Sequence, residues 1–239
     1  MKKKKMKNLK NLLFLGIVLF VKLNVSAQTS PLRFGIKTGL NLSSATVHDA
    51  TGTNSKTGYH IGGTLEYSFS QKFLIKSGLL FSTKGSKIDQ LNASSYIPSP
   101  IDDTHTFNAS YLILPLHGAY RLNVNNTVDI VLGAGPYFGY GIGGKTTQKL
   151  NSGSWSNGST ENEWKTFGSG VYDENRNWLH GTTLKQLDIG IGATLDFEYQ
   201  NFVLGIGYEQ GLKNIATQDS YYKPQYKNRA IQASIGYKL

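Results

Sequence analysis

The amino-acid sequence predicts an all-β fold, an eight-stranded antiparallel up-and-down β-barrel that crosses a membrane. Three observations predict it. The 239 residues include 27 glycines and 14 tyrosines but only 17% charged residues, a composition that suits strands and turns better than helices. Apolar and polar residues alternate with a period of two in eight segments. The connections between these segments are alternately short and long, as in outer-membrane barrels.

The eight expected strands each present one apolar face. In chain order they cover 32–42, 59–69, 73–84, 112–122, 128–141, 187–198, 202–209 and 231–239. Their apolar faces begin at Leu32, Tyr59, Phe73, Leu112, Val128, Leu187, Phe202 and Ile231. Each face then recurs at every second residue, as the pleat of a strand requires, with a few small, hydroxyl or proline residues among the apolar ones.

The opposite faces carry all the charges of these segments. Six are basic and six are acidic: Arg33, Lys37, Lys76, Lys84, Arg121 and Lys238, with Glu66, Asp129, Asp188, Asp196, Glu198 and Glu209. In a membrane barrel the uncharged face meets lipid, where an arginine or lysine at the midplane costs about 2–4 kcal/mol. The inward groups should then pair as a polar network of the lumen, expected to hold Arg33, Lys37, His60, Glu66, Lys76, His117, Arg121, Asp129, Asp188, Asp196 and Glu209.

Alternation alone also fits a soluble β-sandwich or calycin-like barrel. The lengths of the connections decide between these folds and a membrane barrel. The short ones lie around 70–72, 123–126 and 200–201, and the long ones cover 44–57, 86–105, 144–184 and 213–226. This sorting is typical of short periplasmic turns and long external loops, and an even strand number places both termini in the periplasm. Aromatic residues beside the short turns predict an interfacial girdle of Tyr67, Phe69, Phe73, Tyr120, Phe197, Phe202 and Tyr237.

The first 27 residues have the pattern of a signal peptide. A lysine-rich start precedes the apolar run 12–21, and Val25-Ser26-Ala27 places small residues before a cleavage site at Gln28. An uncleaved anchor helix is the alternative, although the run is too short to span a bilayer. We therefore expect a signal peptide at 1–27 and one barrel domain at 28–239, in the outer membrane of a Gram-negative bacterium.

The net charge of +10 belongs mostly to this leader. Seven of the 25 basic residues precede residue 28, which leaves 18 basic against 15 acidic residues and a net charge of +3. A nucleic-acid partner is therefore not expected. The sequence has no cysteine, which excludes disulfides, thiolate metal sites, cysteine nucleophiles and a lipid anchor on cysteine.

Several short motifs resemble a known family. They are Phe34-Gly35-Ile36-Lys37-Thr38-Gly39-Leu40-Asn41-Leu42, Leu114-Pro115-Leu116, Gly133-Ala134-Gly135-Pro136-Tyr137 and Gly236-Tyr237-Lys238-Leu239. In order and spacing the chain resembles the PorT-like outer-membrane β-barrel family over essentially all of 28–239. The resemblance implies the outer membrane and a link to secretion, and it carries over no catalytic residue. The chain departs from the family pattern at its end, because Leu239 stands where such barrels usually have an aromatic residue.

Two further patterns point to no cofactor or metal. Residues 139–146 match the phosphate-binding pattern G-x-x-x-x-G-K-[ST], but no helical periodicity follows, so we interpret them as part of a strand. The five histidines lack metal-ligand spacing, and the acidic residues of 144–184 form no calcium loop. We expect no catalytic, cofactor-binding or metal-binding residue.

We expect a non-enzymatic structural or surface-interaction protein that acts through its external loops. All three tryptophans, Trp155, Trp164 and Trp178, lie in 144–184, which predicts a docking surface for a protein or glycan partner, besides the membrane lipid. Alternatively, these rings form a small core, or the segment extends strands five and six beyond the membrane. The first competing function is a lipid-modifying enzyme using the inward His60, Glu66 and His117. The second is a narrow solute channel, although eight strands leave room only for their own side chains or one small ligand.

Overall fold

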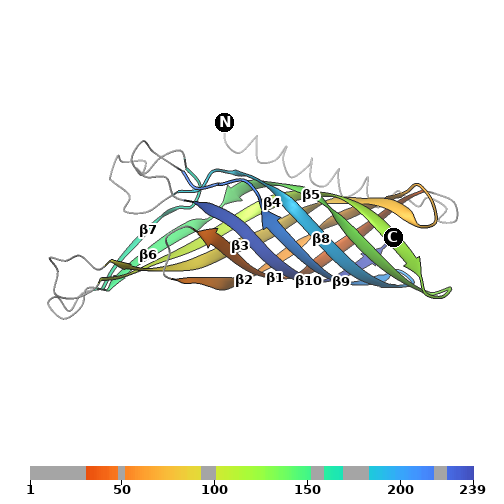
Figure 1. Ribbon diagram of the computed structural model, residues 1–239, viewed down its shortest axis with the longest axis horizontal. Helices are drawn as coiled ribbons and strands as arrows, with labels where there is room; N and C mark the ends of the chain where they lie inside the picture. Colours follow the sequence, from red (N-terminus) through yellow and green to blue (C-terminus); the bar gives the residue numbers. More distant parts are fainter. Residues whose placement is uncertain (1–30, 48–51, 93–100, 152–158, 169–182, 218–224) are drawn as a thin grey trace, which may run out of the picture. The chain divides into compact units, whose positions relative to one another are not determined.

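The computed structural model describes residues 31–47, 52–92, 101–151, 159–168, 183–217 and 225–239 (Figure 1). The chain divides into two compact units, Met1–Leu32 and Arg33–Leu239, and the second is described below. Its strands are β1 (Leu32–Val47), β2 (Gly52–Ser68), β3 (Phe73–Asn92), β4 (Ile101–Asn123), β5 (Val128–Gly143), β6 (Lys145–Asn151), β7 (Ser159–Lys165), β8 (Leu187–Tyr199), β9 (Phe202–Gly211) and β10 (Tyr226–Lys238). Within the described part of the chain, no helix is long and apolar enough to cross a membrane.

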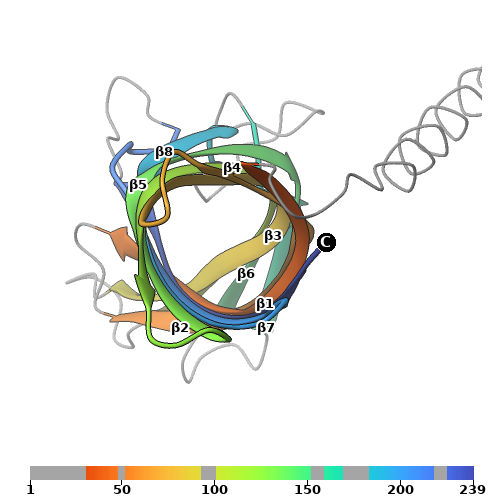
Figure 2. The same cartoon turned by 90° about the vertical axis from the view of Figure 1, so that its right-hand side faces the viewer.

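Eight of these strands close into a barrel. Each pairs with the next in the order β1, β2, β3, β4, β5, β8, β9 and β10, and β10 returns to β1 with Gly35 opposite Lys238 and Val47 opposite Tyr226 (Figure 2). The remaining two strands form a hairpin: β6 continues β5 and pairs with the first part of β4, and β7 pairs with β6. The predicted eight-stranded antiparallel up-and-down barrel is confirmed.

The apolar faces expected from the sequence point outward. Leu40, Leu114 and Ile206 are 62%, 44% and 60% exposed, whereas their chain neighbours turn into the lumen. Aromatic rings meet edge to face beside the short turns, with centroids 5.0 Å apart for Tyr67–Phe69, 5.2 Å for Phe73–Tyr120 and 5.2 Å for Phe202–Tyr237. We call this end, which holds the turns and the C-terminus, the short-turn end, and the opposite one the loop end.

The strands are longer, and the connections shorter, than the sequence predicts. Strand β4 begins at Ile101 rather than at 112, and β3 continues to Asn92, so most of the expected loop 86–105 is sheet. The reason is an inversion of polarity along the strand. On the short-turn side of this inversion, the outward residues of β4 include its leucines. On the loop side, the outward residues are Asn108, Thr106 and Thr104, while the inward Phe107 and Ala109 are buried. The sequence prediction follows the apolar outer face, so it ends each strand where that face becomes polar.

The segment 144–184 is corrected in the same way. Lys145–Asn151 and Ser159–Lys165 are strands, so the alternative that this segment extends the fifth and sixth strands of the barrel is the observed one for these residues. The residues 152–158 and 169–182, and with them Trp155 and Trp178, lie outside the described part of the chain.

The phosphate-loop pattern is a strand with an irregularity. Gly144 has φ +151°, and a Cβ there would lie 2.0 Å from the carbonyl oxygen of Asn108. This glycine shifts the inward parity from odd residues in β5 to even residues in β6. No helix N-terminus follows it, because β6 starts at Lys145. The geometry that phosphate binding requires is therefore not present at these residues.

Candidate functional site

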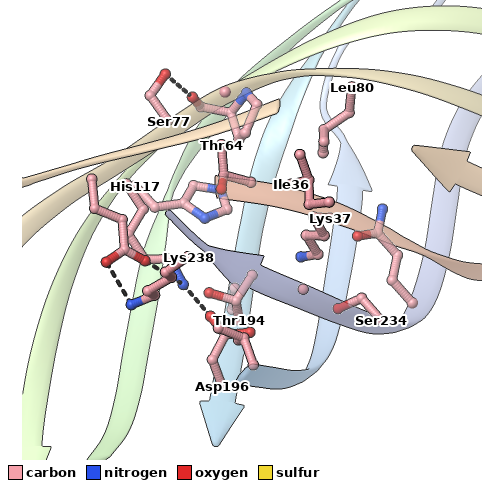
Figure 3. A pocket seen from close by; sticks show the side chains of 18 of the residues that line it. Ile36, Lys37, Thr64, Ser77, Leu80, His117, Thr194, Asp196, Ser234 and Lys238 are labelled. Carbon is pink, nitrogen blue, oxygen red and sulfur yellow. Dashed lines mark hydrogen bonds and ion pairs between the residues drawn. The ribbon is translucent and has the colours of Figure 1, made fainter. Parts of the chain in front are cut away.

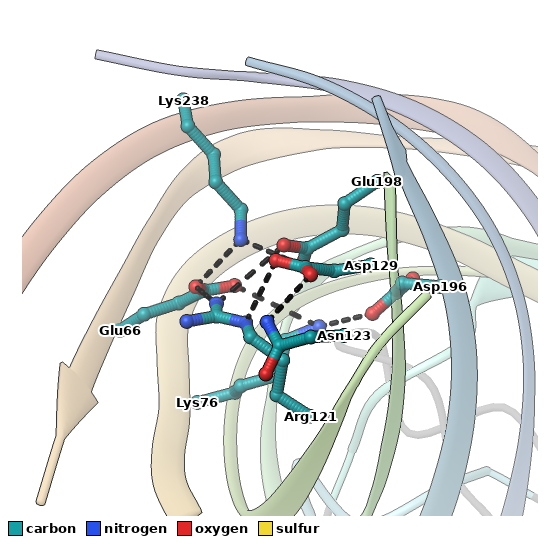
Figure 4. Close-up of polar contacts among 8 residues, drawn as sticks. All are labelled: Glu66, Lys76, Arg121, Asn123, Asp129, Asp196, Glu198 and Lys238. Carbon is teal, nitrogen blue, oxygen red and sulfur yellow. Dashed lines mark hydrogen bonds and ion pairs between the residues drawn. The ribbon is translucent and has the colours of Figure 1, made fainter. Parts of the chain in front are cut away.

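The lumen at the short-turn end holds a cluster of ion pairs (Figure 4), and the charged residues come from six strands. Lys238 Nζ lies 2.7 Å from Glu66 Oε2 and 2.6 Å from Glu198 Oε1. Arg121 Nη2 lies 3.3 Å from Glu66 and 3.5 Å from Glu198, so these two cations and two carboxylates form a closed square. All four side chains are nearly buried, and such groups stabilise a fold only when each charge is matched.

Four further residues complete this cluster. Lys76 pairs with Asp196 and lies 3.8 Å from Glu66, which joins β3 to β8 and β2. Asp129 lies 3.5 Å from Arg121 Nε and accepts a 2.7 Å hydrogen bond from Asn123 at the rim. The network therefore cross-links the walls of the barrel and fills this end of its lumen.

A cavity of about 70 Å³ lies next to the cluster (Figure 3). It is lined by Lys37, His117, Thr194, Glu209 and Gln232 together with members of the cluster. His117 Nε2 and Thr194 Oγ1 are buried and have no hydrogen-bond partner among the described residues. This volume is large enough for a few water molecules, the usual partners of such buried polar atoms.

The middle of the lumen carries a second polar layer. Lys84 Nζ lies 2.6 Å from Glu209 Oε2 and 4.6 Å from the ring centre of Tyr137. The Tyr137 hydroxyl donates to Asp188 Oδ2 at 3.1 Å, and Asn228 Nδ2 donates to the same oxygen at 2.8 Å. Asp188 is therefore held by neutral donors rather than by a salt bridge of the described residues.

His60 and His117 do not form a catalytic constellation. His60 Nδ1 lies 2.7 Å from Asn41 Oδ1, and Asn41 Nδ2 in turn donates to Ser82 Oγ at 2.9 Å. Among the described residues, no serine hydroxyl or carboxylate is hydrogen-bonded to either histidine. A nucleophile, a base and an orienting group within hydrogen-bond reach are what such chemistry requires.

The loop end is filled by an apolar core. One cluster holds Ala45, Ile88, Phe107, Leu184, Ile215, Ala216 and Tyr226, and a second holds Leu80, Ala109, Tyr111, Ile113 and Tyr137. The Phe167 ring touches both and packs edge to face on Tyr111, with centroids 5.3 Å apart. Leu184, Ile215 and Ala216 are 0% exposed, although they belong to connections rather than to strands. Segments expected as external loops thus return into the barrel and close it.

Tyr226 shows how polar atoms are satisfied in this core. Its ring packs on Phe107 with centroids 5.1 Å apart, and its hydroxyl lies 2.9 Å from Ser86 Oγ. Burial raises the pKa of Tyr226 above the ordinary value. The hydroxyl therefore stays protonated at neutral pH and can donate that hydrogen bond.

The structure places the expected site residues in different surroundings. Glu66, Lys76, Arg121, Asp129 and Asp196 meet in the cluster at the short-turn end, while Lys37, His60, His117, Asp188 and Glu209 lie farther along the lumen. Arg33 is exposed and forms no ion pair with the described residues, because β10 ends opposite Gly35. Tyr111, Tyr137 and Asn228 belong to the network although the sequence did not single them out. The signal available in the sequence was that each occupies a position that faces the lumen in the alternation of its strand.

Trp164 lies inside the barrel extension. It is 7% exposed, on the inner side of β7, and its ring packs edge to face on His105 with centroids 6.0 Å apart. This tryptophan therefore stabilises the extension and is not open to a partner. Among the described residues, no group of histidines and carboxylates has an arrangement that could hold a metal ion.

One family model matches this chain, and several solved structures are similar to it. The family model described as outer membrane protein beta-barrel domain matches residues 26–217. No curated protein matches the chain in sequence. Ail, the attachment invasion locus protein of Yersinia pestis, is 15% identical with a TM-score of 0.37, over 88% of this chain and 100% of that chain.

Two further solved structures are similar to the same degree. Neisserial surface protein A is 12% identical with a TM-score of 0.37, over 86% of this chain and 97% of that chain. OprG from Pseudomonas aeruginosa is 14% identical with a TM-score of 0.44, over 90% of this chain and 99% of that chain. A complex of Ail with the heparin analogue sucrose octasulfate is also similar, at 14% identity and a TM-score of 0.39, over 87% of this chain and 99% of that chain.

Proposed function

Because the chain belongs to the outer membrane protein beta-barrel domain family, we propose that it is a closed outer-membrane barrel and acts through its loop end as a non-enzymatic structural or surface-interaction protein. The observation that carries this proposal is the apolar core at the loop end. Leu184, Ile215 and Ala216 are completely buried there, inside a barrel wall whose outer surface has become polar. An extension with an apolar interior and a polar outer surface resembles a water-soluble barrel. It can hold the loop end in a fixed position for contact with a partner.

A solute channel is less well supported by the same geometry. An apolar core lies at one end of the lumen and the ion cluster at the other, and the cavity next to the ion cluster has a volume of only about 70 Å³. Planar-bilayer recording tests this directly. We expect no steady conductance from the folded protein, and regular single-channel steps would overturn the closed barrel.

The proposed orientation places the loop end outside the cell and both termini in the periplasm. The proposed signal peptide, 1–27, lies outside the described residues, and an intact mass beginning at Gln28 is the expected outcome. The absence of cysteine makes site-directed labelling clean. Lys149→Cys, on the exposed face of β6, should react with an impermeant maleimide on intact cells. Lys72→Cys, at a short turn, should react only after the outer membrane is permeabilised; the opposite pattern would reverse the orientation.

The proposed partner site is narrowed by the position of Trp164. Because that ring is buried, only Trp155 and Trp178 remain candidates for a docking surface for a protein or glycan. Trp155→Ala and Trp178→Ala should reduce cross-linking to a surface partner without changing the heat-dependent gel mobility of the barrel. Trp164→Ala is the contrasting variant and should lower stability instead. Equal cross-linking by all three variants and the wild type would remove the tryptophans from the proposed site.

The narrower resemblance to PorT-like barrels adds a proposed link to secretion. It rests on the short motifs around Phe34–Leu42, Leu114–Leu116 and Gly133–Tyr137. A deletion strain should then accumulate exported proteins that normally reach the medium, and re-expression of the full chain should restore their release. Unchanged secreted proteins in the deletion strain would exclude this role and leave the surface role in place.

A further inference from the structure

The outward surface of β1, β8, β9 and β10 contains an apolar groove. Its volume is about 760 Å³, and it is lined by Leu40, Tyr59, Leu195, Phe197, Leu204 and Ile206, among others. Ala233 forms the floor, because the strand register places it between Leu40 and Ile206. The next outward residue of β10, Ile235, is 59% exposed and stands beside this floor as a wall. A small side chain between large ones leaves room for an extended hydrocarbon chain.

Basic side chains lie on β10 beyond one end of this groove, on the loop-end side of the outward residue Ile231. Arg229 and Lys227 are on the same outward face of β10 as Ala233, four and six residues nearer the loop end. At 3.2–3.4 Å per residue, Arg229 is roughly 13 Å from the floor along the strand. Ser44 Oγ accepts a 3.2 Å hydrogen bond from Arg229 Nε, which holds the guanidinium against the barrel wall. Arg229 therefore sits where the apolar outer surface ends.

Two further lysines belong to the same part of the wall. The backbone nitrogen of Lys213 donates to the carbonyl oxygen of Ile189 at 3.1 Å, and that of Lys185 donates to the carbonyl oxygen of Ile215 at 2.6 Å. The nitrogen of Ile215 donates in turn to the carbonyl oxygen of Tyr226, the residue before Lys227. The segments that carry Lys185, Lys213, Lys227 and Arg229 are therefore neighbours on the wall.

These four cations have no acidic partner in the described part of the chain. The aspartates and glutamates of residues 32–47, 183–217 and 225–239 are Asp188, Asp196, Glu198 and Glu209, and all four are buried in the lumen. Elsewhere on the same end, each cation of a comparable set faces a carboxylate. Lys87 lies 3.7 Å from Asp89, Lys145 lies 2.6 Å from Glu163, and Lys149 lies 3.3 Å from Glu161. The positive charge on this part of the wall is thus unbalanced by the described residues.

We propose that the groove over Ala233 and the cations above it bind one outer-leaflet lipid with a phosphate headgroup, its acyl chain on Ala233 and its phosphate on Arg229 and Lys227. Arginine and lysine match phosphate by charge-assisted hydrogen bonds, and they stand at the depth where an acyl chain joins a headgroup. The proposal rests on the orientation proposed above, with the loop end outside.

Native mass spectrometry of the full, folded barrel in detergent tests this site. The probes are bisphosphorylated lipid A, the same lipid with its phosphates removed, and inorganic phosphate alone. We expect one lipid to remain bound, at least tenfold weaker binding after dephosphorylation, and no retention of inorganic phosphate. Equal binding of the phosphorylated and dephosphorylated lipids would show that the cations do not recognise the headgroup, and competition by inorganic phosphate at equal concentration would assign the site to a free anion.

Variants separate the two halves of the site. Arg229→Gln with Lys227→Gln should weaken binding of the phosphorylated lipid roughly 30-fold, from the contribution of two basic residues near an anionic lipid. Ala233→Phe should weaken binding of both lipid forms by filling the groove. Lys145→Gln with Lys149→Gln is the matched control on β6 and should bind like the wild type. Unchanged binding in the Arg229/Lys227 variant, with normal heat-dependent mobility, would overturn the proposal.

The test of the lipid site can fail independently of the test of the proposed surface function. Lipid retention is measured on the purified barrel, whereas the partner site is measured by cross-linking through Trp155 and Trp178. Loss of cross-linking with intact lipid binding would contradict only the partner site. A reversed labelling pattern of Lys149→Cys and Lys72→Cys would instead move the cations to the periplasmic leaflet and overturn the assignment to an outer-leaflet lipid.

Discussion

Lys84 of β3 and Glu209 of β9 form an ion pair across the lumen, with 2.6 Å between Lys84 Nζ and Glu209 Oε2. Their side chains are 1% and 9% exposed, and 125 residues separate them in the chain. Tyr137 lies against the ammonium group with its ring centre 4.6 Å away. Two strands that do not pair with each other are therefore joined through the middle of the barrel.

Removing one member of this pair should destabilise the barrel strongly. Lys84→Met leaves the Glu209 carboxylate buried without its cation, and breaking a buried pair in this way costs about 3–5 kcal/mol. The double variant Lys84→Met/Glu209→Leu should recover much of that loss, because no unpaired charge remains. Urea unfolding in phospholipid vesicles, followed by gel mobility, measures both.

The control for this pair is an exposed one. Lys145 and Glu163 lie 2.6 Å apart with side chains 70% and 51% exposed, and Lys145→Met should cost less than about 1 kcal/mol. A Lys84→Met variant as stable as Lys145→Met would show that the lumen is wetter than the structure indicates.

Two glycines of the phosphate-loop pattern should be intolerant of a methyl group. A Cβ at Gly144 would lie 2.0 Å from the Asn108 carbonyl oxygen at a positive φ, and one at Gly141 would lie 2.3 Å from the Phe167 ring. Gly144→Ala should therefore cost about 1–3 kcal/mol. Gly141→Ala should displace Phe167 and loosen the core at the loop end. Gly143→Ala is the matched control, since nothing lies within 4 Å of its Cβ; equal losses at 143 and 144 would contradict the strain argument.

An arginine scan should trace the limits of the apolar outer surface. Leu114→Arg, Leu132→Arg and Ile191→Arg should each cost about 2–4 kcal/mol in bilayers. Thr194→Arg, on the inner face, should act only by crowding the lumen. Thr106→Arg lies on the same outward face of β4 as Leu114 but above the polarity inversion, so it should be tolerated. Equal tolerance at Leu114 and Thr194 would refute the register, and intolerance at Thr106 would move the membrane boundary upward.

The buried hydroxyl of Tyr226 should make the loop end sensitive to high pH. Burial raises its pKa in the folded state above the unfolded value of about 10, so above that pH the unfolded state loses its proton first. Stability should therefore be constant below about pH 9 and fall as the pH rises past 10. Tyr226→Phe should make the free energy of unfolding fall less steeply with pH. At neutral pH the same variant should lose about 1 kcal/mol of stability, because the hydrogen bond to Ser86 is removed. Identical pH profiles for the variant and the wild type would contradict the assignment.

Part of the lumen site could be predicted because inward parity is a local property. The alternation around Glu66, Lys76 and Arg121 places their side chains opposite the apolar face in any register. Arg33 has the same parity and yet is exposed, because whether a strand has a neighbour at that height depends on where β10 ends. Which carboxylate meets which cation likewise follows from barrel closure, as Lys238 with Glu66 shows across 172 residues.

The sequence by itself determined the number of membrane-crossing strands and which residues face outward, because a strand in lipid must be apolar on one side at every second residue. Only the tertiary structure decided how far those strands continue. Beyond the apolar outer surface the selection reverses: water covers the outside, and Phe107, Tyr226 and Ile215 are buried inside. When the apolar face of a strand changes from the outside to the inside, the sequence alternation is interrupted. The residues beyond that point are then predicted as a loop unless the neighbouring strands are known. The closing of the barrel, the burial of Trp164 and the inward return of Leu184 and Ala216 follow from those neighbours.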